Sequence, residues 1–159
     1  MIERIQVGLL FILIPVGLVF WYTTSENITL EELFFPGTKV VHIDDVSMRV
    51  EVADTDEERI KGLSGKEDIG RVNGLLFMFP REGYHGIWMK DMKFPIDIIW
   101  IDTNLNVVAV DKSVLPETFP KTFRPPVPVQ YLIETEARYT EIFGIKAGDK
   151  VVLPKKLED

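Results

Sequence analysis

The sequence predicts a mainly β domain, a sandwich or barrel with one or two short helices, that follows an N-terminal membrane helix. From residue 38 onward, short runs rich in Val, Ile and aromatic residues alternate with Gly, Pro, Asn and Asp at close spacing, a pattern typical of sandwiches and barrels. An apolar segment occupies the first 22 residues. The chain has 159 residues, which is enough for one domain with a full hydrophobic core, and it contains no internal repeat.

The segment Ile5–Tyr22 predicts a membrane-spanning helix. It carries no charged residue, and as a helix it is about 27 Å long, close to the ~30 Å hydrocarbon core of a bilayer. Trp21 and Tyr22 end it, where aromatic rings favour the headgroup layer. A cleaved signal peptide is the alternative, but its apolar region is normally shorter and precedes an Ala-x-Ala-like site. We therefore expect residues 1–22 to be an anchor that is not cleaved.

The charges that flank this segment predict its orientation. Arg4 and the terminal amine precede it, whereas Glu26, Glu31 and Glu32 follow it and the next basic residue is Lys39. The positive-inside rule then places the N-terminus in the cytoplasm and the domain outside it. The expected organisation is an anchor at residues 1–22, a linker at 23–37 and an extracytoplasmic β domain at 38–159.

The β domain is predicted to begin with a hairpin and a short helix. Lys39–Ile43 and Ser47–Ala53 are rich in Val and Ile, and the two aspartates between them favour a turn. Thr55 and Glu58 form a capping box, in which each side chain accepts a hydrogen bond from the other's backbone amide. Gly62 is suited to end the helix that starts there, after about two turns.

The rest of the domain is predicted to consist mainly of short strands. A second short helix is expected at Ala137–Phe143, closed by Gly144. Because apolar residues stand on both sides of Asp97, Ile96–Trp100 is expected to be a central strand covered on both faces. The further strands are expected at Leu75–Phe79, Tyr84–Lys90, Ile96–Asp102, Val107–Val114, Gln130–Glu134 and Lys150–Leu153.

Composition excludes several classes of function. The net charge of −7, with no cluster of Lys or Arg, argues against nucleic-acid binding. The chain has no cysteine, which excludes disulfides, thiolate nucleophiles and Cys-based zinc sites. It has only two histidines, which leaves open no more than a His-plus-carboxylate metal site. No nucleophile elbow, P-loop, dinucleotide-binding glycine motif or HExxH motif occurs, so we expect no catalytic motif, no metal and no cofactor.

The polar residues between His85 and Asp102 are the chief candidates for function, because burying a polar group unpaired costs roughly 1–3 kcal/mol. We expect the two strands of this region to pair as a hairpin. In one register Lys90 lies opposite Asp97; in the other, His85 and Asp97 share a face. Asp97 then either locks the hairpin, through Lys90 or backbone amides, or forms the base of a pocket. Trp88 is expected in the core or as a stacking floor for a ligand.

The irregular segment between Val114 and Val129 is the second candidate region. It holds five of the ten prolines, and loops of this length in compact domains often bind ligands. The alternative is a strap whose Phe residues plug the open end of the barrel. Together the two regions predict a pocket made of His85, Trp88, Lys90, Asp97, Phe119, Phe123 and Arg124.

The chain resembles the domain of unknown function 192 family between about Arg59 and Pro154. The most distinctive part of the resemblance is His85-Gly-Ile-Trp-Met-Lys90 followed by Pro95-Ile-Asp97. Further matching motifs are Gly62-Leu-Ser-Gly65, Gly74-Leu-Leu-Phe-Met-Phe79, Tyr131-Leu-Ile-Glu134 and Gly144-Ile-Lys-Ala-Gly-Asp149. The resemblance implies a compact, mainly antiparallel β-sandwich of jelly-roll type with one or two short helices, often exported or membrane-tethered.

The resemblance implies a fold but no activity, since the family has none established. The chain departs from the family pattern in having Asp91 in place of Asn, Arg138 in place of Gly, and no Cys in the Pro-rich loop. We therefore expect a membrane-anchored extracytoplasmic module, held by residues 5–22, that binds a small molecule or an envelope component. The alternatives are a hydrolase-like enzyme that uses Asp97 with His85 or Lys90, and a structural module that binds a partner protein of the cell envelope.

Overall fold

The structure is a computed structural model that describes residues 34–154 of the chain. The fold lies within the compact unit Thr38–Asp159. Within the described range, no helix has the length and apolar character needed to cross a membrane. The predicted anchor at residues 1–22 and most of the predicted linker at 23–37 lie outside the described residues.

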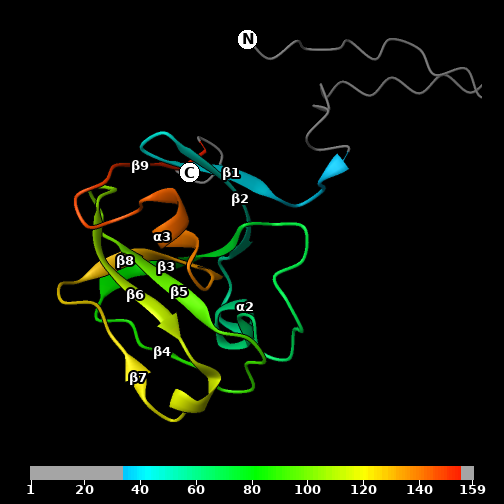
Figure 1. Cartoon of the computed structure of the whole chain (residues 1–159). Helices are drawn as coiled ribbons and strands as arrows, with labels where there is room; N and C mark the ends of the chain where they lie inside the picture. Colours follow the sequence, from blue (N-terminus) through cyan, green and yellow to red (C-terminus); the bar gives the residue numbers. More distant parts are fainter. Residues whose placement is uncertain (1–33, 155–159) are drawn as a thin grey trace, which may run out of the picture. The chain divides into compact units, whose positions relative to one another are not determined.

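A single curled sheet forms the frame of the domain (Figure 1). Every strand pairing in it is antiparallel except that of β2 with β3. Within residues 34–154 this sheet has seven strands, in the order β6 (Val107–Val114), β5 (Ile96–Ile101), β8 (Val129–Glu136), β3 (Gly74–Gly83), β2 (Val46–Ala53), β1 (Lys39–Ile43) and β9 (Val151–Val152).

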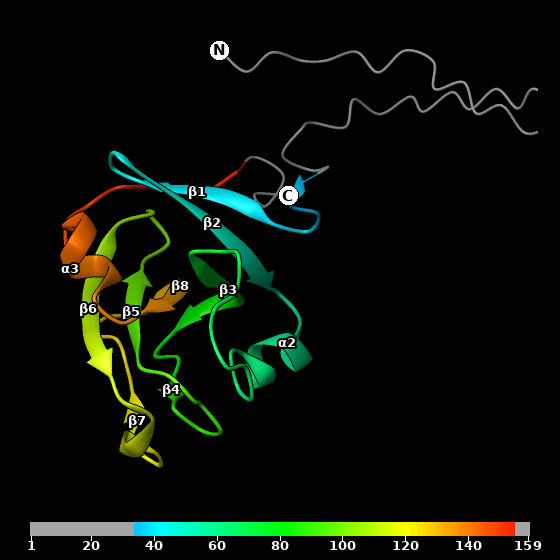
Figure 2. The same cartoon turned by 45° about the vertical axis from the view of Figure 1, so that its right-hand side comes forward.

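The sheet is curled (Figure 2), and the segments that precede its two edge strands, β6 and β9, meet at one end. Asn106 and Lys150 form an antiparallel bridge, and Val151 N donates to Leu105 O at 2.8 Å. These contacts add to the twist that strands carry in any sheet. The mainly β fold with two short helices is confirmed, but the chain forms one curled sheet, a half-barrel, and not the two stacked sheets of a jelly-roll sandwich.

The two short helices follow their local sequence signals. In α2 (Asp56–Lys61) the predicted capping box is confirmed: Glu58 N donates to Thr55 Oγ1 at 3.2 Å, and Thr55 N donates to Glu58 Oε2 at 3.1 Å. The second helix, α3 (Tyr139–Phe143), starts later than predicted because Arg138 has a φ of 72°, in the left-handed region that favours glycine. A single turn of 3₁₀ helix, η1 (Pro116–Thr118), lies in the Pro-rich segment.

The predicted hairpin of Tyr84–Lys90 with Ile96–Asp102 is wrong. The first of these segments contributes only β4 (Ile87–Trp88), which pairs with β7 (Thr122–Phe123) in a separate two-stranded ribbon. Both edges of β5 are already occupied by β6 and β8, so no edge remains for the 84–90 segment. The sequence pattern of a single strand does not indicate which other strand it will pair with.

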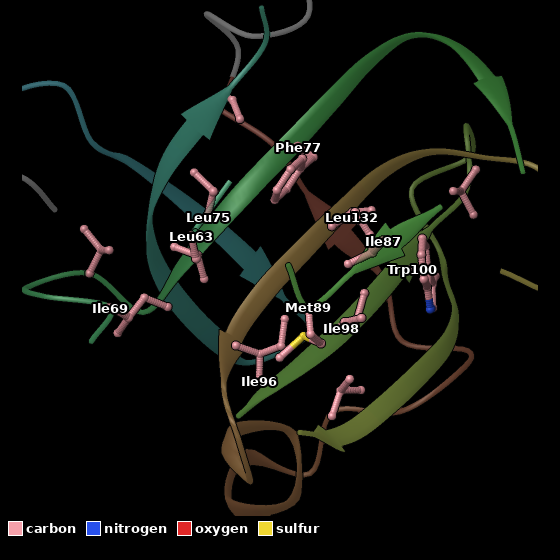
Figure 3. Close-up of a cluster of buried hydrophobic side chains, with 14 residues drawn as sticks. Leu63, Ile69, Leu75, Phe77, Ile87, Met89, Ile96, Ile98, Trp100 and Leu132 are labelled. Atoms are coloured by element: carbon pink, nitrogen blue, oxygen red, sulfur yellow. The ribbon is translucent and has the colours of Figure 1, made fainter. Parts of the chain in front are cut away.

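Apolar side chains cover both faces of the central strands, as predicted for β5, whose six residues are all buried. One face, here called the α2 face, packs against Leu63 and Ile69 of the segment that follows α2 and against Ile87 of β4 (Figure 3). It carries Leu75, Phe77, Ile98, Trp100 and Leu132. The opposite face, here called the α3 face, carries Leu76, Ile99, Ile101 and Ile133. Since side chains alternate along a strand, Glu134 belongs to the α2 face and Asp97 to the α3 face.

Candidate functional site

A pocket of about 340 Å³ opens on the α2 face, between α2 and β4. Its walls come from α2 and the turn that follows it, from the aromatic residues of β3, and from β4. Glu134 of β8 contributes a carboxyl group to its lining. We call this cavity the Glu134 pocket.

The turn after α2 leaves space beside the Glu134 carboxyl because it begins with glycine. Gly62 has a φ of 48°, which L side chains rarely adopt. A Cβ atom at this position would lie 3.2 Å from Phe77 Cζ and 3.8 Å from Glu134 Oε2. Leu63, the next residue, turns into the core and is 2% exposed. The chain therefore passes close to the carboxyl without covering it with a side chain.

Glu134 is a buried acid whose burial is not compensated. The residue is 4% exposed, and its Oε2 has no hydrogen-bond partner. Its neighbours in register are Leu75 on β3 and Ile98 on β5, both apolar and buried. Burial raises the pKa of the Glu134 carboxyl to about 8, with no neighbouring charge to offset it. At neutral pH the group is therefore mainly a neutral carboxylic acid, able to donate one hydrogen bond and accept others.

Two aromatic residues of β3 form the apolar wall, and their positions are secured by neighbours. The ring of Phe79 stacks on His85, with ring centroids 3.6 Å apart and planes 5° apart. The Arg59 guanidinium also lies over the Phe79 ring, with its Cζ 5.8 Å from the ring centroid. Phe77 lies next to Phe79, its centroid 6.5 Å away. His85 itself is held by a 3.0 Å contact between its Nε2 and Arg81 O.

The Arg59 side chain serves as a structural cation at the edge of the pocket. Its guanidinium donates to Met78 O at 2.7 Å, to Asp54 O at 2.5 Å, and to Asp56 Oδ1 at 2.6 Å. These bonds tie α2 to β3 and hold the charge beside Phe79. They also place an ion pair, Arg59 with Asp56, in the lining of a largely apolar cavity, which Lys61 lines as well.

The mouth of the pocket carries an exposed tryptophan. Trp88 is 51% exposed, and its ring meets Phe119 edge to face, with centroids 6.1 Å apart. Lys90 Nζ lies 5.9 Å from the centroid of the same ring. Of the seven predicted pocket residues, Trp88 is the one that lines this cavity.

Asp97 lies on the other face and is fully hydrogen-bonded. It is wholly buried, and it accepts hydrogen bonds from Ser113 N (2.7 Å), Arg138 N (3.2 Å), Thr140 N (3.0 Å) and Thr140 Oγ1 (2.6 Å). The sequence offered Lys90 or backbone amides as hydrogen-bond partners of Asp97. Backbone amides bind it, and the predicted pairing with Lys90 is wrong. The backbone of α3 and of β6 supplies donors that no feature of the 85–102 segment reveals.

The other predicted residues occupy neighbouring but separate positions. Arg124 Nη1 donates to Tyr84 O at 2.6 Å, which ties the Pro-rich segment to the chain before β4. Phe123 packs against the core of the α2 face, with Lys121 Nζ 4.4 Å above its ring. His85 stacks on the ring of Phe79 and is not part of the pocket lining. The structure therefore does not bring Asp97 together with His85 or Lys90.

Glu134 and Arg59 were missed by reasoning from sequence, although a signal for Glu134 was present. The carboxyl follows Leu132 by two positions in an apolar strand, so alternation places it on a buried face. It also stands in one of the motifs that resemble the family. Arg59 gave no such signal, because a basic residue in the last turn of a helix is ordinary. Among the residues that the structure describes, no group of three or more His, Cys, Asp or Glu side chains is placed to hold a metal ion.

Solved structures of two bacterial proteins share the fold. One is a protein of unknown function from Novosphingobium aromaticivorans DSM 12444, with 24% identity, a TM-score of 0.68, and coverage of 72% of this chain and 84% of that one. The other, from Sinorhizobium meliloti 1021, is described as a candidate transcription regulator; it has 21% identity and a TM-score of 0.68, with coverage of 73% and 93%. At this identity the likeness concerns the fold alone.

None of the curated proteins compared with the chain is similar to it in sequence. The profile of one family, DUF192, described as an uncharacterised family, matches residues 39–153. This match covers well over half of the chain and includes every strand of the curled sheet. The chain therefore belongs to the domain of unknown function 192 family.

Proposed function

We propose that this protein is a membrane-anchored extracytoplasmic module that binds a small molecule in the Glu134 pocket. The observation that carries the proposal is the Glu134 carboxyl, buried in the pocket lining with Oε2 lacking a hydrogen-bond partner. Native proteins leave few such groups, and each one left has a cost that a ligand removes when it supplies the missing hydrogen bond. A concave, largely apolar cavity with one or two polar groups is the usual form of a ligand site.

The chemistry of the lining favours binding over covalent catalysis. The hydroxyl group in the lining, that of Ser64, already donates to Lys90 O at 2.8 Å and has no general base beside it in the contacts it makes. A nucleophile needs such a base within hydrogen-bond reach. The enzymatic alternative that uses Asp97 has no support from the geometry, because the four hydrogen bonds to its oxygens commit that carboxyl to the fold.

Support for the anchored, extracytoplasmic setting comes from the sequence. The uncharged Ile5–Tyr22 segment has the length of a membrane span, and its flanking charges favour an exported C-terminal domain. The absence of cysteine is compatible with an oxidising compartment. In this setting the pocket would sample small molecules outside the cytoplasm while the anchor keeps the domain at the membrane surface.

Ligand binding is tested on the full chain in detergent micelles, by methyl NMR against water-soluble fragments. We expect shifts at Leu63, Ile87 and Met92, which line the pocket. Trp88→Ala should weaken binding about tenfold, because it removes the aromatic surface at the mouth. Phe143→Ala is the matched control, since Phe143 is 49% exposed against 51% for Trp88 and lies on α3. A folded chain whose pocket methyls respond to no fragment would contradict the proposed function.

The membrane orientation is tested by labelling single introduced cysteines in intact cells. The label then reports only the introduced position, because the chain has no cysteine of its own. We expect Asp45→Cys, on the exposed turn between β1 and β2, to react with a membrane-impermeant maleimide without permeabilisation. Ile2→Cys, before the predicted anchor, should react only after the membrane is opened. The reverse pattern, or reaction of neither until lysis, would overturn the proposed orientation.

A further inference from the structure

We propose that the Glu134 pocket selects a neutral, planar ligand that carries a carboxamide group, which pairs with the Glu134 carboxyl through two hydrogen bonds. The inference rests on the proposed binding function and adds the chemical class of the ligand. It is drawn from the state of the buried acid, the charges in the lining and the shape of the walls.

Glu134 has an unsatisfied hydrogen-bonding group. Its Oε2 is the single buried side-chain polar atom without a partner among residues 34–154. The strand neighbours Leu75 and Ile98 offer it no polar group, and Gly62 places no side chain beside it, since a Cβ there would lie 3.8 Å from Oε2. A ligand that satisfies this group must therefore present its own polar atoms from within the cavity. A carboxylic acid both donates and accepts, so its best complement also does both.

The pocket lining favours a ligand without net charge. A cationic ligand would have to be desolvated next to Arg59, whose guanidinium lies at the pocket wall and is held there by three hydrogen bonds. An anionic ligand would also lose its hydration in the largely apolar cavity. The Arg59 guanidinium is already paired with Asp56 Oδ1 at 2.6 Å, which leaves Lys61 as the other cation in the lining. Buried ion pairs seldom recover the desolvation of both charges. A carboxamide forms an N–H···O and an O–H···O hydrogen bond with the neutral acid, and no charge has to enter the cavity.

The walls of the pocket favour a flat ligand. Phe77 and Phe79 line the pocket with rings whose planes differ by 22°, and Trp88 stands at the mouth. Aromatic walls favour flat ligands, which pack face to face or edge to face with them. The volume of about 340 Å³ lies at the lower end of the range for small-molecule pockets, so it suits a ligand of one or two rings.

The experiment compares three one-ring probes on the full chain in detergent micelles: benzamide, benzylamine and benzoate. They share a ring but present a neutral donor–acceptor group, a cation and an anion. At pH 6.5 we expect benzamide to bind at least about tenfold more tightly than either charged probe, measured by pocket methyl shifts. Since binding uses the acid form, its affinity should fall about tenfold per pH unit above the Glu134 pKa of about 8.

Variants of the acid separate this pairing from simple apolar binding. Glu134→Gln keeps a donor and an acceptor, so benzamide should still bind but without the fall at high pH. Glu134→Leu removes both and should weaken benzamide about tenfold or more. Glu136→Gln is the matched control, because it lies on the same strand and is exposed, and it should leave both affinity and pH profile unchanged.

The failures of the two proposals are distinguishable. If fragments bind in the pocket but benzamide is no better than benzylamine, or if benzylamine gains affinity as the pH rises towards 8, the carboxamide inference is overturned and the binding function stands. If neither the three probes nor any fragment shifts the pocket methyls of a folded chain, both proposals fall.

Discussion

Two buried carboxyl groups on neighbouring strands, those of Asp97 and Glu134, differ in their hydrogen bonding. Asp97 on β5 lies opposite Thr135 of β8, and the next residue, Ile98, lies opposite Glu134. The two acids are thus one register step apart but point to opposite faces of the sheet. Asp97 receives four hydrogen bonds, while Glu134 Oε2 receives none.

Because both acids are buried, it is their hydrogen bonding that separates the structural acid, Asp97, from the candidate site, Glu134. Around Asp97, donors from β6 and α3 converge, so the carboxyl fastens both elements to the central strand. Around Glu134 no hydrogen bond to Oε2 offsets the cost of burial, so burial favours the protonated form of the carboxyl. The first arrangement has no unmet need, whereas the second leaves one that a ligand can meet. The same burial therefore fastens the fold in one place and leaves an unsatisfied polar group beside a cavity in the other.

Removing the satisfied acid is expected to have the largest effect on stability. Asp97→Ala leaves the buried donors of Thr140 and the amides of Ser113 and Arg138 without an acceptor. We expect it to lower the free energy of unfolding by about 3–5 kcal/mol in urea titrations. The exposed Asp45→Ala should change it by less than about 0.5 kcal/mol. A loss below about 1 kcal/mol for Asp97→Ala would remove the contrast between the two acids.

Removing the unsatisfied acid is expected to stabilise the fold, in a pH-dependent way. The Glu134 pKa is raised from 4.5 to about 8, so between these values the folded state holds a proton that the unfolded state has released. The free energy of unfolding therefore falls by about 1.4 kcal/mol per pH unit as the pH rises through this window, and levels off above it.

Glu134→Gln cannot ionise and should lack this slope. We expect it to exceed the wild type by roughly 3 kcal/mol in unfolding free energy at pH 7, and by little at pH 4.5. Urea titrations of both proteins at a series of pH values measure the gap, with Glu136→Gln as control. Curves that stay parallel across this range would mean that Glu134 is not kept neutral by burial.

Closing the space beside Glu134 is expected to have a moderate effect. Gly62→Ala forces a left-handed φ on alanine and places Cβ 3.2 Å from Phe77 Cζ, which should cost about 1–2 kcal/mol. Gly65→Ala is a matched control, because its φ is 78° and nothing lies within 4 Å of the added Cβ. Both should lose stability by denaturant titration, but only Gly62→Ala should alter the pocket methyl shifts. Equal shifts in both variants would show that Gly62 does not border the site.

The smallest effect is expected at Lys90. Its ammonium is exposed and lies 5.9 Å from the Trp88 centroid, a contact worth about 0.5–1 kcal/mol. Lys90→Ala should lower the unfolding free energy by no more than this. A double-mutant cycle with Asp97→Ala should give a coupling energy near zero, since the two side chains do not pair. A coupling above about 1 kcal/mol would restore the pair that the hairpin prediction implied.

Local features of the chain could be predicted from the sequence. The strand Val107–Val114, the capping box at Thr55 and the end of α2 at Gly62 all follow from residues within a few positions of one another. The central place of β5 also followed, because a run of apolar residues on both sides of a strand needs cover on both faces. Family membership followed from the motifs around Trp88.

The pairing of strands and the candidate site were decided only by the tertiary structure. The donors that satisfy Asp97 come from 16 to 43 positions away, and the space beside Glu134 exists because the distant Gly62 turns over it. Whether a buried carboxyl is satisfied or unsatisfied depends on such long-range neighbours. By itself, therefore, the sequence determined where most strands of the curled sheet and the buried Asp97 lie along the chain. Tertiary packing decided which acid holds the fold together and which faces a pocket, because hydrogen-bond partners are assigned in space and not along the chain.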